Sequence, residues 1–369
     1  MSKTAIIITT INVPKILKDI SENLSNYKKL SDSSILVIGD KKTPDGIREY
    51  CGKIASQFGN EIEYLDINEQ EKNLQKYKDL LKLFPYNTPD RVILGNMISY
   101  LRGYDRLIAV DDDNYPTHYD FVGFHSITGR EVELRLIKND SGWFNVHNAL
   151  VEENNIPFYP RGFPWGQRTP ESSKKTYHSA KVKVVANQGL VLGDPDIDAI
   201  SRLFHPIRAV AMKPEFGSQF GLSPATWSPF NYQNTSLCRE LIPLYYRPIS
   251  AKRNADIWTA YLINKLAQHF NDVITFGQPL VKQIRNPHSL WEDLDVELIN
   301  NRATDYLITI LRNVSLSEKT YFEALRELLS KSQKKMEEMD NIPFLEFEMI
   351  KSFFKEYQIW WEIVSEIIK

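Results

Sequence analysis

The first third of the chain alternates short apolar segments with amphipathic ones, and this alternation constrains the fold more than any other feature. The apolar, β-rich segments are 4–11, 34–40, 61–67 and 106–113. The segments between them have helical periodicity, and Thr88, Pro89 and Gly103 suit the start and end of the last such helix. A β-α-β-α-β-α-β order predicts a parallel, Rossmann-like sheet covered by helices.

The rest of the chain divides into a mixed region and a helical one. The segments 131–137 and 181–193 resemble strands between Pro/Gly-rich loops, and helical periodicity dominates from about residue 300. We predict an α/β domain over 1–298, whose mixed, mainly parallel sheet is flanked by helices. It has a nucleotide-binding half (1–117) and a sugar and acceptor half (118–298). A helical C-terminal extension over 299–369 follows. Its last, aromatic-rich helix is expected to pack on this subdomain; a homo-oligomer contact or membrane-surface association is the alternative.

Composition narrows the class of protein. Lys and Arg number 45 against 47 Asp and Glu, a net charge of −2, so no basic field indicates nucleic acid. Two distant cysteines, Cys51 and Cys238, favour neither a disulfide framework nor a CxxC metal site. No run of about 18 apolar residues occurs, and 1–14 lacks the features of a signal peptide. A cytoplasmic protein without a transmembrane segment is expected.

Ligands of open α/β sheets bind at the carboxyl ends of the strands. The polar residues that follow the first three predicted strands are therefore candidates for binding a nucleotide. They are Thr9, Thr10 and Asn12 after the first, Asp40 and Lys41 after the second, and Asp66 after the third.

Three consecutive aspartates, Asp111, Asp112 and Asp113, end the fourth predicted strand. Alternate strand residues share a face, so Asp111 and Asp113 can hold one cation while Asp112 points away, towards a ribose or sugar hydroxyl. Mg²⁺ and Mn²⁺ prefer such carboxylates and leave room for phosphates. The alternative is a simple turn, for which Asp-Asn-Tyr-Pro is well suited. The position at the end of a buried strand favours metal–diphosphate binding.

A Rossmann-like half that ends on Asp-x-Asp resembles the GT-A glycosyltransferases. "ILVIGDKKTPDG" is similar to the second-strand region of STELLO-type proteins, and "YPRGFPW" resembles the Arg-Gly motif of reversibly glycosylated polypeptides, the UDP-arabinopyranose mutases. "NQGLVLGDPDIDAISRL", "NADIWTAYLINKL" and "RNPHS" resemble further stretches of the same group in the same order. The likeness covers about 3–295 and implies a GT-A fold, a nucleotide-sugar donor (a UDP-sugar first) and Mn²⁺ or Mg²⁺.

The resemblance also implies residue roles. Asp256 corresponds to a general base, His288 to a third metal ligand, and Arg161 to a residue that contacts phosphate or sugar. Within "DPDID", Asp194 or Asp196 can bind sugar hydroxyls, with Asp196 favoured because Asp198 suits a helix N-cap.

Each of these roles has a structural alternative. Asp256 suits the N-cap of its helix, His288 a loop before a helix, and Arg161 an ordinary surface position. Trp258 suits either a wall of the sugar site or a buried helix face.

One departure from the mutases changes the expected reaction. They carry a second arginine about seven positions before the Arg-Gly motif, where this chain has about Asn154. The prediction is therefore a metal-dependent, inverting glycosyltransferase that acts on a glycan or lipid-linked acceptor in surface polysaccharide synthesis. The alternatives are a pyranose/furanose mutase and an inactive sugar-nucleotide-binding scaffold.

Overall fold

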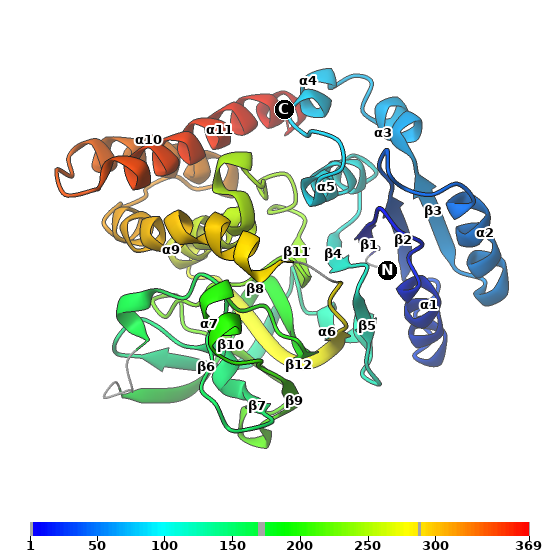
Figure 1. Cartoon of the computed structure of the whole chain (residues 1–369), viewed down its shortest axis with the longest axis horizontal. Helices are drawn as coiled ribbons and strands as arrows, with labels where there is room; N and C mark the ends of the chain where they lie inside the picture. Colours follow the sequence, from blue (N-terminus) through cyan, green and yellow to red (C-terminus); the bar gives the residue numbers. More distant parts are fainter. Residues whose placement is uncertain (1–2, 169–173, 287–288, 369) are drawn as a thin grey trace.

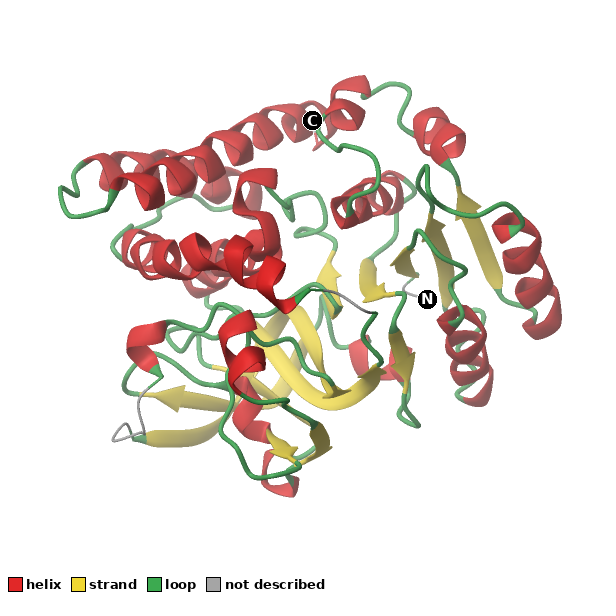
Figure 2. Ribbon diagram, viewed as in Figure 1, coloured by secondary structure: helices red, strands yellow, loops and turns green. Residues whose placement is uncertain are grey.

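The computed structural model describes residues 3–168, 174–286 and 289–368 (Figure 1). Within these ranges, strands form one mixed sheet in the order β3-β2-β1-β4-β11-β8-β6-β10-β12-β5, and β9 joins β7 to β8. Figure 2 shows helices along the sheet and a stack of long helices beside it. The predicted mixed α/β sheet, flanked by helices and followed by a helical C-terminal part, is confirmed.

The strands have the following bounds: β1 Thr4–Thr9, β2 Ser33–Ile38, β3 Glu61–Leu65, β4 Arg106–Asp111, β5 Asn114–Pro116, β6 Glu131–Asn139, β7 Leu150–Glu152, β8 Lys175–Gly193, β9 Ala209–Met212, β10 Gln219–Leu222, β11 Asn234–Cys238 and β12 Val273–Gln283. The α-helices have the following bounds: α1 Ile16–Asn26, α2 Ile47–Phe58, α3 Ile67–Asn73, α4 Lys78–Lys82, α5 Val92–Leu101, α6 Phe121–His125, α7 Ala199–Phe204, α8 Ala255–Phe270, α9 Leu290–Arg312, α10 Tyr321–Glu337 and α11 Phe344–Ile368. Short 3₁₀ turns include η1 Pro89–Arg91 and η5 Ile249–Asn254.

The N-terminal part of the sheet is parallel, as predicted. β1 lies between β2 and β4, and Thr9 pairs in register with Ile38 on one side and Asp111 on the other. The carboxyl ends of three strands are therefore level with one another. β1 and β4 each end two residues earlier than the sequence pattern predicts.

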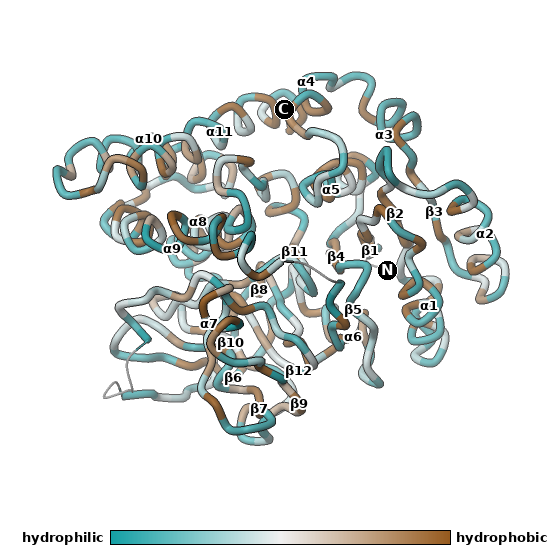
Figure 3. The backbone as a smooth tube through the Cα atoms, viewed as in Figure 1, coloured by the Kyte–Doolittle hydropathy of each residue, from teal (hydrophilic) through white to brown (hydrophobic). Residues whose placement is uncertain are grey.

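Helices cover both faces of this parallel part because alternate strand residues point to opposite sides. Ile6 and Ile8 belong to a core cluster with α1 and α2 residues, whereas Ala5 and Ile7 belong to the cluster that contains α5. In Figure 3 the strands β1 and β2 accordingly contain hydrophobic segments between more hydrophilic outer helices.

The C-terminal helices pack on the rest of the chain. Trp360 of α11 is fully buried, stacks on Tyr246 at 4.8 Å and donates from its indole to the Pro243 carbonyl (2.9 Å). These contacts join α11 to the α/β part of the chain, and α11 also contacts α9 and α10 of the C-terminal subdomain, as expected. The predicted division at 298/299 falls inside α9, which is continuous from Leu290 to Arg312. None of the helices in the described ranges is long and apolar enough to cross a membrane.

Candidate functional site

Two adjoining cavities open at the carboxyl ends of the parallel strands. Their volumes are about 590 and 470 Å³, and both are lined by residues 87–89, Asp111, Tyr232 and Arg247. The smaller cavity borders the ends of β1 and β4, and the larger one borders the start of α8. Together they form one cleft where the sequence predicts a ligand site, with Asp111 at the junction.

The aspartate triplet combines the strand-end and turn interpretations. β4 ends at Asp111, and Asp112 and Asp113 form a turn that leads directly into β5. Asp112 does point to a different partner, because its carboxylate lies 2.6 Å from the hydroxyl of Thr10. Asp113 accepts a hydrogen bond from the Gln283 side chain (3.2 Å). All three aspartates line the smaller cavity.

The electrostatics of the triplet favour a bound cation. Asp111 faces the cleft and is exposed to water there. The protein that surrounds its carboxyl nevertheless raises the pKa by desolvation, and Asp113 raises it further. Arg247 lowers this pKa, and the resulting value is about 8. Burial likewise raises the pKa of Asp113. Two such carboxylates suit Mg²⁺ or Mn²⁺, which are commonly held by one or two carboxylates plus waters and phosphates.

The described residues provide no third protein ligand for a metal ion beside Asp111 and Asp113. No cluster of three or more His, Cys, Asp or Glu side chains suited to a metal ion occurs among residues 3–168, 174–286 and 289–368. His288, the predicted third ligand, lies outside the described residues. The fit to a cation therefore rests on Asp111 and Asp113.

The residues after β1 line the smaller cavity, as predicted. Thr9, Thr10 and Asn12 all contribute to its wall. The Thr10 hydroxyl accepts from the Asn12 amide (2.9 Å) and so connects this loop to Asp112. The buried Thr9 hydroxyl has no hydrogen-bond partner in the described part of the chain, so it can form a hydrogen bond with a ligand.

The residues after β2 shape the cleft more than they face it. Asp40 lines the smaller cavity, but its carboxylate accepts from the backbone amides of Asn87 (2.6 Å) and Lys41 (2.7 Å) and lies 3.7 Å from Arg91. It thereby fixes the loop that both cavities share. The Lys41 ammonium lies 3.7 Å from the centre of the Tyr86 ring and lines neither cavity.

Asp66, predicted to meet the base or ribose, is used elsewhere. Its carboxylate caps α3 by accepting from the Glu69 amide (2.9 Å) and forms an ion pair with Arg48 (2.6 Å). It lines neither cavity of the cleft. A cap and an ion pair explain this aspartate without a ligand.

The Arg-Gly loop places Arg161 in the larger cavity. Gly162 has φ +72 and lies so close to Ile257 of α8 that a Cβ atom would collide with it. The Tyr261 hydroxyl donates to the Gly162 carbonyl (2.7 Å), and the Arg161 amide donates to the Asp196 carbonyl (3.0 Å). This tight backbone packing fixes where the guanidinium emerges.

Arg161 bridges the two acids that the sequence assigns to sugar and acceptor chemistry. Its Nε and Nη2 donate to Asp196 (2.9 Å each), and Nη2 donates to Asp256 (3.0 Å). All three side chains are less than a tenth exposed. Burial opposes the charge on Arg161, yet Asp196 and Asp256 raise its pKa well above the usual value. Arg161 in turn outweighs burial and lowers the pKa of Asp196. The surface interpretation of Arg161 is wrong.

Asp256 is not the N-cap of its helix. The cap residue is Asn254, and Asp256 lies in the first turn of α8, where its carboxylate also accepts from the Ile257 amide (3.0 Å). Trp258 is fully buried and donates to the Thr304 hydroxyl (2.8 Å), so the buried interpretation of that residue is confirmed.

Within "DPDID" the three aspartates have separate roles. Asp198 caps α7 by accepting from the Ser201 amide (2.8 Å), as predicted. Asp194 forms ion pairs with Arg202 and Arg285, the latter at 2.9 Å. Asp194 lines neither main cavity, and Asp196 is the one that lines the larger cavity.

Sequence reasoning missed two cationic residues of the cleft. Arg247 lines both cavities and forms an ion pair with Asp90 (3.0 Å). Lys252 lines the larger cavity and is exposed, and its backbone (φ 48, ψ −124) is one that L-residues rarely adopt. The segment "YYRPISAKRN" has no pattern that distinguishes these cations from surface ones. A strained lysine at the rim of a cleft is a candidate for anion binding.

No family model and no curated protein sequence matches the chain. Solved structures with some likeness include a mycobacterial protein of 11% identity and TM-score 0.40, which covers 82% of this chain and 73% of that one. Another is glucosyl-3-phosphoglycerate synthase from Mycobacterium tuberculosis with Mg²⁺ and uridine diphosphate: 13% identity, TM-score 0.41, 86% of this chain and 81% of that one. The same enzyme with Mn²⁺, UDP-glucose and phosphoglyceric acid has 12% identity and TM-score 0.41, with 87% and 85% covered. At such TM-scores the likeness carries no weight for the function of this chain.

Proposed function

We propose that the chain is a metal-dependent glycosyltransferase of the GT-A type. It would transfer a sugar from a nucleoside diphosphate sugar, a UDP-sugar first, to a glycan or lipid-linked acceptor in surface polysaccharide synthesis. The observation that carries this proposal is the position of Asp111, which borders both cavities beside Asp113. A cation held there would lie between a nucleoside site and a sugar site, where the diphosphate must lie.

The two cavities suit different parts of the substrates. The smaller one, with Thr9, Thr10 and Asn12, has room and hydrogen-bonding groups for the nucleoside, and the Thr9 hydroxyl has no partner among the described residues. The larger one, with Asp196 and Arg161, offers polar groups for the sugar and acceptor. A bound Mg²⁺ or Mn²⁺ would stabilise the negative charge of the departing diphosphate.

In the transfer step, the bond between the anomeric carbon and the diphosphate oxygen breaks, and its electron pair leaves with the diphosphate. A bond forms from the acceptor oxygen to that carbon, and the acceptor proton passes to Asp256 in the proposed inverting reaction. Arg161 would orient the Asp256 carboxylate through its hydrogen bond from Nη2 (3.0 Å). Acceptor binding must displace this contact so that an oxygen of Asp256 can accept the proton.

Lys252 and Arg247 are candidates to contact the diphosphate or an anionic acceptor. Both line the larger cavity, and the Lys252 ammonium has no hydrogen bond or ion pair within the described residues. A lysine ammonium binds phosphate as a point charge, and an arginine as a planar fork.

Thermal unfolding with UDP in the presence and absence of Mn²⁺ tests the proposal. A ligand at a hundred times its Kd stabilises the folded state by about 2.7 kcal/mol. We expect Mn²⁺-dependent stabilisation of the wild type that is lost in the double variant Asp111→Asn, Asp113→Asn. This variant removes like charges and should fold. Asp79→Asn, on the surface of α4, is the charge control. No Mn²⁺-dependent stabilisation of the wild type by UDP or UDP-sugars would refute the metal–diphosphate site.

Product analysis then separates the alternatives. A transferase releases UDP and lengthens an acceptor, whereas a mutase changes the ring form of the donor sugar without any acceptor. A scaffold binds the donor, releases no UDP, and keeps its affinity in the Asp111→Asn, Asp113→Asn variant.

A further inference from the structure

A separate cavity of about 1070 Å³ lies at the opposite end of β4 from the cleft. Arg106, the first residue of β4, lines this cavity, whereas Asp111, the last, lines the cleft. Five steps of about 3.3 Å along a strand separate them by roughly 17 Å. The proposed glycosyltransferase site therefore does not explain this second cavity.

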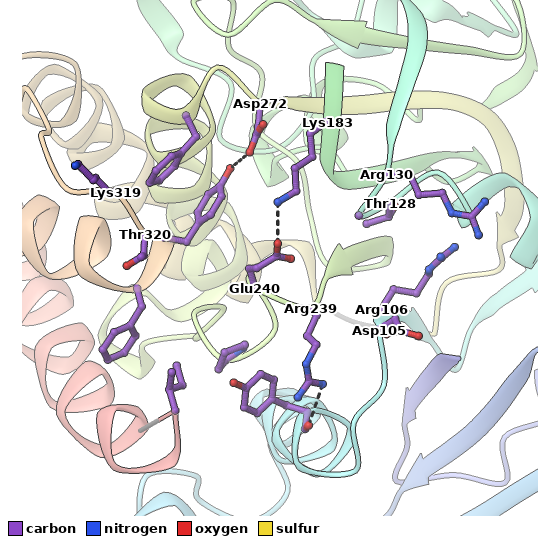
Figure 4. A pocket seen from close by; sticks show the side chains of 17 residues that line it. Asp105, Arg106, Thr128, Arg130, Lys183, Arg239, Glu240, Asp272, Lys319 and Thr320 are labelled. Atoms are coloured by element: carbon purple, nitrogen blue, oxygen red, sulfur yellow. Dashed lines mark hydrogen bonds and ion pairs between the residues drawn. The ribbon is translucent and has the colours of Figure 1, made fainter. Parts of the chain in front are cut away.

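One wall of the cavity is cationic (Figure 4). Arg106 and Arg130 extend from different segments into the same region, and Lys183 and Arg239 lie nearby. Arg106 is only 3% exposed. Burial lowers its pKa, the nearby Arg130 guanidinium lowers it further, and the Asp105 carboxylate opposes both. Two neighbouring guanidinium groups at a cavity wall, one of them buried, attract an anion.

Two further cations of this wall, Lys183 and Arg239, are engaged within the protein. Lys183 forms an ion pair with Glu240 (2.7 Å), which Figure 4 shows in the middle of the cavity. Arg239 donates to the carbonyls of Tyr100 (3.2 Å) and Tyr104 (2.8 Å). Arg130 is exposed, and its side chain has no hydrogen bond or ion pair to any residue that the structure describes. Its charge is therefore available to a ligand.

The opposite wall is aromatic. It includes Phe270 at the end of α8, and Tyr321 and Phe322 at the start of α10. The ring centres of Phe270 and Tyr321 lie 4.4 Å apart. The Tyr321 hydroxyl donates to Asp272 (2.6 Å), and Tyr321 lines the cavity. Phe322 stacks on Trp361 of α11 at 4.7 Å, which holds it in place. This wall suits an apolar or planar group.

We propose that this cavity is a second ligand site, which binds a small molecule with a phosphate group and an aromatic or apolar body. Arg106 and Arg130 would hold the phosphate, because a guanidinium matches phosphate oxygens with paired hydrogen bonds. The body of the ligand would lie against Phe270, Tyr321 and Phe322. The volume is ample for such a molecule, since ligand sites commonly measure about 300–1000 Å³.

Calorimetric titration with inorganic phosphate and phenyl phosphate, at constant ionic strength, tests this proposal. The variant is Arg130→Ala, because this exposed side chain is not needed for packing. The matched control is Lys181→Ala, which removes one positive charge from β8 at a position that does not line the cavity. Lys181 forms an ion pair with Glu131 there (3.1 Å).

We expect phenyl phosphate to bind the wild type more tightly than phosphate does. Arg130→Ala should weaken both by about tenfold or more, as expected for lost charge-assisted hydrogen bonds, and Lys181→Ala should leave both unchanged. Phosphate that binds only in the cleft would be insensitive to Arg130→Ala. That result, equal affinity for the two probes, or no binding of either would overturn the proposal.

Discussion

Replacement of Arg161 by methionine tests whether the buried triad of Arg161, Asp196 and Asp256 is a coupled electrostatic unit. The change keeps an unbranched apolar stem but leaves two carboxylates, each less than a tenth exposed, without their shared cation. Removing one partner of a buried ion pair typically costs about 3–5 kcal/mol. Little discount for solvent screening applies at this degree of burial. Over 369 residues, a melting entropy of about 2.1 cal/mol/K per residue converts that cost into a fall in Tm of about 4–6 °C.

The pH dependence of this loss has a definite sign. Because Arg161 lowers the folded-state pKa of Asp196, its stabilisation is present above the ordinary aspartate pKa of 3.8 and is lost as pH falls through the lower folded value. In Arg161→Met the unpaired, buried Asp196 carboxylate can take up a proton instead. The stability gap between wild type and variant should therefore be largest near pH 7 and narrow towards pH 4.

Urea unfolding at several pH values measures this gap. Adding Asp196→Asn and Asp256→Asn to Arg161→Met should recover part of the stability, because the unpaired charges are gone. Arg102→Met is the control, since Arg102 pairs with Glu63 at the surface and such pairs contribute at most about 1 kcal/mol. Equal losses for Arg161→Met and Arg102→Met, or a gap that widens at low pH, would refute the electrostatic reasoning.

Two further predictions concern backbone strain and a buried histidine. Lys252→Gly should raise Tm, because glycine relieves a backbone strain that costs about 1–3 kcal/mol at such a φ. The same change should weaken anion binding in the cleft, because it removes the ammonium. An unchanged Tm would contradict the strain, and unchanged anion binding would contradict the role of the ammonium. Burial lowers the pKa of His125 to about 3 from its ordinary 6.5, so the folded state excludes a proton and stability rises with pH between these values. Lowering the pH from 7 to 5 should reduce the free energy of unfolding of the wild type by about 2 kcal/mol through this residue. In urea unfolding over the same pH range, His125→Gln should lose about 2 kcal/mol less than the wild type. An identical pH dependence in both proteins would contradict this.

Local patterns predicted the parallel part of the fold well. The four strands and the helices α1, α2 and α5 over 4–111 follow from apolar periodicity, whereas the short helices α3 and α4 were not predicted. Thr88 and Asp198 act as caps as their residue types predict. Asp111 was identifiable because a run of acids at the end of a buried strand is unusual. These inferences succeed because periodicity and capping depend on residues only a few positions apart.

Other assignments depended on contacts between distant segments. Asp66 follows a strand as Thr9 does, yet it caps α3 and pairs with Arg48, because the chain turns into a helix at once. Asp196 and Asp256 are 35 and 95 positions from Arg161, and only the packing of α8 beside the Arg-Gly loop brings the three together.

By itself, the sequence determined that a parallel sheet forms and that acidic residues lie at its carboxyl edge. The tertiary structure alone decided that Arg247 and Lys252 face the same cleft, and that Arg106 and Arg130 line a second cavity at the other end of β4. The physical reason is that secondary structure follows from short-range sterics and apolar spacing. Charges of distant segments meet only where the packed core places them.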